Sequence, residues 1–107
     1  MRRKSTKTWE MDSAVIEFLR GHKGKENKAS ANMLAKHLRS LGYDVKDPRG
    51  IIIRVMQERN APICSAGRGG YWWAASREDI DTAIADAESR IAAYTERIKF
   101  YESFILD

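Results

Sequence analysis

Isoleucine recurs at every seventh position near the end of the chain, and this spacing constrains the fold more than any other feature. Apolar residues alternate there in steps of four and three, at Ile80, Ile84, Ala87, Ile91, Tyr94, Ile98, Tyr101 and Ile105. Such a repeat predicts an α-helix with one apolar seam, the pattern of a coiled coil. From first to last seam residue the helix would be roughly 38 Å long, too long for a small domain to cover completely.

The charged residues beside this seam favour a parallel pair of helices. With the repeated isoleucines at heptad position a, Arg90 and Arg97 fall at g, and the acidic residues at e are Asp81, Glu88 and Glu102. In a parallel pair Arg97 meets Glu102 of the partner subunit, whereas an antiparallel pair brings like charges together. We therefore expect a parallel homodimer. The alternative is a helix that packs only on its own domain, and Phe100 and Phe104, outside the seam, leave room for such packing or for a wider bundle.

The net charge of +4 is unevenly distributed along the chain. Residues 1–75 contain 15 Lys and Arg against 7 Asp and Glu, a balance of +8. Residues 76–107 contain 4 against 8, a balance of −4. Such asymmetry suggests a basic part that meets a polyanion and an acidic part with another role.

The composition argues against an enzyme, a metal protein and a membrane protein. The single cysteine, Cys64, excludes an internal disulfide and a multi-cysteine zinc site. Neither His22 nor His37 belongs to a convincing metal or nucleophile constellation, and the segment 67–70 lacks the Gly-Lys-Ser/Thr ending of a nucleotide-binding loop. The basic start is not followed by an apolar stretch, and no apolar run of about 18 residues exists. We expect a cytoplasmic, non-enzymatic protein without cofactor or metal.

Two helices are expected in the first 42 residues. Thr8 or Asp12 could cap the first, and its apolar face is formed by Met11, Val15, Phe18 and Leu19. A polar loop follows at 21–28. Ser30 suits the cap of the second helix and Gly42 its end, and the apolar residues between them are Ala31, Leu34, Leu38 and Leu41.

A third helix is expected from Pro48 to about Arg59, because Asp is a good cap and Pro is favoured at the first helical position. One arc of this helix holds Ile52, Val55, Met56 and the stem of Arg59. The opposite arc presents Gly50, Arg54 and Gln57, with Arg49 near the N-terminal end. The β-branched run 51–53 would also suit a strand, but the Asp-Pro start and the length favour a helix.

A hairpin follows at once. The extended run 63–65 is turned by the glycine-rich segment 66–70, and 71–74 runs back. Because strand side chains alternate, either Trp72 or the pair Tyr71 and Trp73 packs on the helices. The tryptophans are expected in the core or in a dimer contact rather than stacked on bases, and Lys28-Ala29 could add a third strand.

The order helix, loop, helix, turn, helix, hairpin is that of a winged helix-turn-helix. We therefore expect a mainly α fold with a small β-hairpin, divided into a basic arm at 1–7, a winged-helix domain at 8–75 and a dimerisation helix at 76–107. In such a fold the helix before the hairpin is the recognition helix and the hairpin is the wing. The turn from Gly42 to Asp47 is longer than the three or four residues of the simplest helix-turn-helix motifs.

The hairpin and the start of the last helix also carry a specific run of residues. Pro62-Ile63-Cys64-Ser65 precedes a glycine-rich tip and Gly70-Tyr71-Trp72-Trp73-Ala74, and Ser76-Arg77-Glu78-Asp79-Ile80 and Ser89-Arg90-Ile91 continue it. This run resembles the wing and C-terminal helix of small phage and prophage winged-helix DNA-binding proteins. The likeness covers residues 29–98, is loose before Pro48 and is structural rather than catalytic. It implies DNA binding in a phage or bacterial setting, without identifying a target sequence or regulatory role.

These patterns predict a duplex-DNA-binding regulator of transcription or replication in the bacterial host cytoplasm. The recognition helix 48–60 would read the major groove with Arg49, Arg54 and Gln57, and the wing 63–74 would place Arg68 on the backbone or minor groove. Phosphate contacts would come from Lys23, Lys25, Lys28, Arg2 and Arg3. The alternative is an adaptor, or a phage inhibitor of a host protein complex, that uses the same scaffold without reading DNA.

Overall fold

The structure is a computed structural model that describes residues 6–66 and 69–105. Within them the chain forms four α-helices, one short 3₁₀ helix and two strands, in the order α1 (Thr6–Arg20), η1 (Lys25–Asn27), α2 (Ala31–Ser40), α3 (Arg49–Glu58), β1 (Ile63–Ser65), β2 (Tyr71–Trp73) and α4 (Arg77–Glu102). The expected mainly helical fold with a two-stranded antiparallel hairpin and a long last helix is confirmed. None of the described helices has the length and apolarity needed to cross a membrane.

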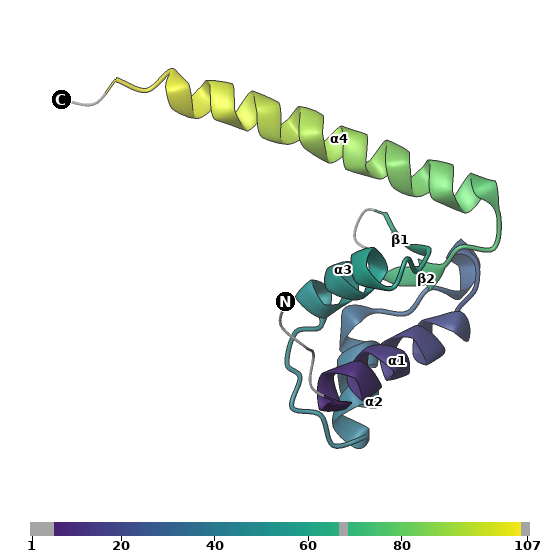
Figure 1. Cartoon of the computed structure of the whole chain (residues 1–107). Helices are drawn as coiled ribbons and strands as arrows, with labels where there is room; N and C mark the ends of the chain where they lie inside the picture. The colour runs from purple at the N-terminus through teal and green to yellow at the C-terminus, as the bar shows by residue number, and fades with distance from the viewer. Residues whose placement is uncertain (1–5, 67–68, 106–107) are drawn as a thin grey trace.

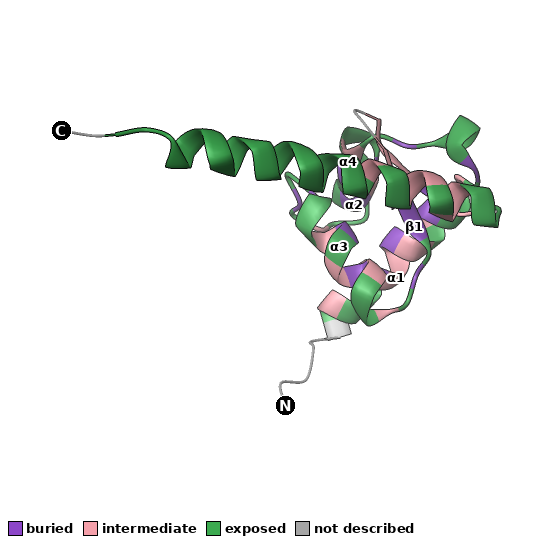
Figure 2. Cartoon of the chain, turned by 90° about the horizontal axis from the view of Figure 1, so that it is seen from above, coloured by how far each residue is buried: buried purple, intermediate pink, exposed green. Residues whose placement is uncertain are grey.

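The first three helices enclose the core (Figure 2). Each contributes buried apolar side chains, among them Val15, Leu19, Leu34, Leu38, Ile52 and Val55. The apolar stripes expected on these helices are therefore confirmed, except that Leu41, just past the end of α2, is exposed. The segment 49–58 is a helix and not a strand.

The hairpin lies between this core and α4 (Figure 1). Ile63 pairs with Trp73 and Cys64 pairs with Trp72. Side chains of paired residues share one face of the sheet. Ile63 and Trp73 accordingly pack against the three-helix core, while Cys64 and Trp72 lie on the opposite face of the sheet and are buried. Strand β1 of the sheet contacts α4. Both tryptophans are therefore packed in the interior or against it, Trp72 completely and Trp73 in part.

A segment before α2 pairs with the other edge of β2. Ala29 N–H donates to Tyr71 O at 2.8 Å, and Tyr71 N–H donates back to Ala29 O at 2.7 Å. Farther along, Trp73 N–H donates to His22 O, and Gly24 N–H donates to Trp73 O, both at 2.9 Å. The third strand expected at Lys28-Ala29 is thus present as a single paired residue, Ala29.

Two helix starts follow the expected capping. Ser30 Oγ accepts a hydrogen bond from Met33 N–H at 3.1 Å, and Ser76 Oγ accepts one from Asp79 N–H at 3.4 Å. The Asp79 carboxylate in turn accepts from the N–H of Ala75 at 2.8 Å. The two serine bonds satisfy N–H groups that a helix leaves without partners, and so they fix where α2 and α4 begin. The Ala75 bond holds the residue just before the cap against the first turn of α4.

Two other helix starts were predicted wrongly. The first helix begins at Thr6, so neither Thr8 nor Asp12 caps it, and Asp12 lies inside the helix with its side chain completely buried. Pro48 precedes α3 instead of occupying its first position. Asp47 still serves the start of α3, because its carboxylate accepts a hydrogen bond from Arg49 N–H at 3.1 Å.

Candidate nucleic-acid interface

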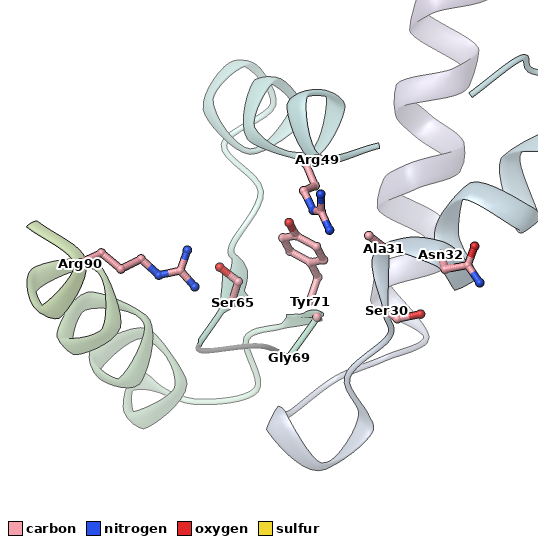
Figure 3. A pocket seen from close by; sticks show the side chains of 9 residues that line it. Ser30, Ala31, Asn32, Arg49, Ser65, Gly69, Tyr71 and Arg90 are labelled. Carbon is pink, nitrogen blue, oxygen red and sulfur yellow. The ribbon is translucent and has the colours of Figure 1, made fainter. Parts of the chain in front are cut away.

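An open depression of about 410 Å³ lies where the N-termini of α2 and α3 meet the hairpin and α4 (Figure 3). Most of the residues that line it are polar, glycine or basic, and together they are Ser30, Ala31, Asn32, Arg49, Ser65, Gly69, Gly70, Tyr71 and Arg90. We call this feature the basic depression. It joins the start of the helix expected to read DNA to the hairpin expected to act as its wing.

Close backbone packing holds the hairpin against the start of α2. Gly70 has φ of +105°, and a Cβ added there would lie 2.4 Å from the carbonyl oxygen of Ala29. A side chain at this position would therefore meet backbone that cannot move aside, in a conformation that L-residues rarely adopt. Glycine at 70 permits the paired hydrogen bonds between Ala29 and Tyr71.

Lys28 and Arg49, which the sequence analysis predicts to contact DNA, both reach this depression. A Cβ added at Gly69 would lie 2.8 Å from Lys28 Nζ, so the ammonium sits against the glycine backbone at the rim. Arg49 is the first residue of α3, and its guanidinium lies 3.3 Å from the carboxylate of Asp47. The side chains of Arg49 and Asp47 are both well exposed. Because solvent screens an exposed ion pair strongly, Asp47 holds Arg49 only weakly.

Arg54 departs from its expected outward position. Its guanidinium pairs with the carboxylate of Asp12 in α1 and lies 3.8 Å from Glu58. The outward arc of α3 is instead formed by exposed residues that include Arg49, Ile53 and Gln57. Periodicity failed here because a partly apolar arginine stem suits either side of a helix, and the buried carboxylate that selects the inner side lies 42 residues away in sequence.

Two other predicted basic residues, Lys23 and Lys25, do not line the basic depression. Lys23 pairs with Trp73, at the end of β2 away from the Ala29–Tyr71 pairing, and Lys25 begins η1 beside it. Arg2, Arg3 and Arg68 lie outside the described residues.

Sequence reasoning missed one arginine at this site. Arg90 of α4 lines the depression, and its Nε lies 2.9 Å from the carboxylate of Asp86 one turn earlier. In the sequence its spacing marked it only as a flank of the apolar seam. The docking of α4 over the hairpin brings it to the depression, and no local pattern reports that docking.

Both histidines lie beside one aromatic ring, and the cysteine is buried. The Phe18 ring lies 4.8 Å from the His22 ring and 4.8 Å from the His37 ring. Burial, and secondarily the negative charge of Asp79, raises the pKa of the Cys64 thiol above its ordinary value. Among the described residues, no three His, Cys, Asp or Glu side chains are grouped so as to hold a metal ion.

Comparison of the chain with protein-family models, with curated proteins and with solved structures finds no match.

Proposed function

We propose that this chain binds duplex DNA as a winged helix-turn-helix protein, with α3 in the major groove and the hairpin as the wing. The observation that carries the proposal is the basic depression, where two helix N-termini, a glycine hairpin and basic side chains converge. Helix N-termini present N–H groups and a positive partial charge, which suit phosphate oxygens. The planar guanidinium of arginine can in addition donate two parallel hydrogen bonds to one phosphate group.

The surface next to the depression supplies the reading function. Gln57 and Arg49 lie on the outward arc of α3, where Gln can pair with adenine and Arg with guanine in the major groove. Ile53 lies exposed between them and offers an apolar contact for a thymine methyl group. Arg54 is not part of this proposed surface, because Asp12 engages it from within the domain. Regulation of transcription or replication in a phage or bacterial setting stays a prediction from the resemblance.

A charge reversal with a matched control tests this proposal. Arg49 and Arg77 are both exposed, each is paired with one aspartate, at 3.3 Å and 3.0 Å, and only Arg49 lines the depression. Fluorescence anisotropy on a mixed-sequence duplex at low salt should show Arg49→Glu weakening binding by about tenfold or more, a loss of ~1.4 kcal/mol. Arg77→Glu, with the same change in net charge, should stay near wild type.

The salt dependence separates phosphate contact from other effects. Losing one phosphate contact should reduce the slope of log K against log salt by about 0.9 for Arg49→Glu. Equal losses for the two variants would show that net charge alone drives binding and would refute the assigned surface. A wild-type chain that binds no duplex at low salt would refute the function and favour the protein adaptor.

A further inference from the structure

The apolar seam of α4 is uncovered over most of its length. Ile84 is 44% exposed, Ile91 65% and Ile98 57%, and Tyr94 and Tyr101 are similarly open. Figure 2 shows the helix leaving the domain, with only its first turns partly buried. A monomer that presents this row of large apolar side chains exposes a patch of the kind that marks an interaction surface.

The domain does not cover the seam, because α4 docks through a different face. The partly buried residues of α4 beyond the seam are Asp79, Thr82, Ala83 and Asp86. At 3.6 residues per turn they lie about a third of the circumference away from the seam. Arg90, which lines the basic depression, continues this docking face. Docking on the domain and pairing through the seam can therefore occur together.

We infer that the seam pairs with the seam of a second copy of this chain, parallel and in register. The charged residues beside the seam favour a second copy of the helix as the partner, and they favour a parallel orientation. In a parallel pair Arg97, which lies over the Tyr94 ring at 4.8 Å to its centroid, faces Glu102 of the partner subunit. In an antiparallel pair the arginines at the g positions would face one another.

The docking geometry accommodates two domains. A two-fold axis along the helix pair places them on opposite sides, because each domain lies about a third of a turn around the helix from its own seam. Both domains remain at the N-terminal end of the pair. Phe104 and the predicted seam residue Ile105 lie past the end of α4, so the helical part of the seam ends at Tyr101. Phe104 contacts Phe100 edge-to-face, with 4.8 Å between ring centroids.

Sedimentation equilibrium tests the second copy. The full chain should have twice its 12.2 kDa mass. The double variant Ile91→Asp with Ile98→Asp should be monomeric, since it places two charges in the seam. Ala85→Asp with Ala92→Asp adds the same charges at the same spacing on exposed positions opposite the seam and should remain dimeric. Circular dichroism should show both variants helical.

Cysteine cross-linking tests the direction. Under oxidation Ile84→Cys and Ile98→Cys should each form a disulfide with its own copy, while Ser89→Cys, on the outer face, and the wild type, whose Cys64 is buried, should not. Cross-links only in a mixture of the two seam variants would overturn the parallel arrangement. A wild-type monomer, a mass of three or more chains, or equal behaviour of the two aspartate variants would overturn the inferred dimer. These measurements contain no DNA, so their outcome is independent of the proposed function.

Discussion

Arg54 of α3 donates to the carboxylate of Asp12, a side chain of α1 with no exposed surface. This pair joins the first and third helices across the core. With Arg54 turned inward beside the buried Ile52 and Val55, the outside of α3 is left to residues that include Arg49, Ile53 and Gln57. The surface proposed to read DNA therefore depends on interior contacts of α3.

Arg54→Met should destabilise the fold by about 3 kcal/mol, because it leaves a buried carboxylate without this cation. Arg49→Met removes an arginine from an exposed pair and should change the free energy of unfolding by less than about 1 kcal/mol. Urea denaturation of the two variants measures the difference. Equal values would mean that the Asp12 carboxylate does not depend on Arg54.

Trp72→Ala should cost about 3–5 kcal/mol of unfolding free energy, the usual range for emptying a buried aromatic position. Trp9→Ala should cost about 1 kcal/mol, because Trp9 is 53% exposed and the change removes its cation–π contact with the Arg59 guanidinium, which lies 3.8 Å from the ring centroid. Thermal unfolding followed by circular dichroism compares the two. A mild Trp72→Ala phenotype would contradict the packing of the hairpin between the core and α4.

Gly70→Ala and Gly50→Ala should change stability in opposite directions. At Gly70 the methyl group meets the Ala29 carbonyl at positive φ, so we expect a loss of at least about 1–3 kcal/mol. A Cβ at Gly50 meets nothing within 4 Å, so alanine should stabilise α3 by roughly 0.5–1 kcal/mol. The denaturation midpoints of the two variants, compared with the wild type, give the sign of each stability change. A stability change of the same sign in both variants would refute the close approach at Gly70.

Cys64 should react slowly with a thiol reagent in the folded protein, because it is buried and its pKa is raised from the ordinary 9.0. The folded chain holds the thiol proton more tightly than the unfolded chain does. The resulting stability is present below about pH 9 and is lost as the pH rises through the folded pKa. Labelling rates with Ser89→Cys as the exposed reference check this expectation. Equal rates for both thiols would contradict the burial.

Features that depend on residues close together in the chain could be predicted from the sequence. The caps at Ser30 and Ser76 were predictable because a hydroxyl at that position satisfies a backbone donor within three residues. The stripes of the core helices followed from their periodicity. The hairpin followed from two apolar runs around a glycine-rich turn.

Contacts between distant segments could not be predicted in this way. The pairing of Asp12 with Arg54 and the arrival of Arg90 at the basic depression both depend on how helices dock. A polar residue in an apolar helical pattern is expected to face solvent or to cap the helix unless its buried partner is known, and for this reason the sequence alone suggests a cap at Asp12. The sequence therefore predicted the helices and the hairpin that form the candidate site, but only some of the side chains that line it.

The reciprocal hydrogen bonds between Ala29 and Tyr71 have a mechanical consequence. They make the hairpin and the start of α2 one stiff unit rather than a flap hinged at the ends of its own strands. A ligand that pushes on the hairpin would transmit the displacement to α2. Amide protons at Ala29 and Tyr71 should accordingly exchange with solvent together and slowly.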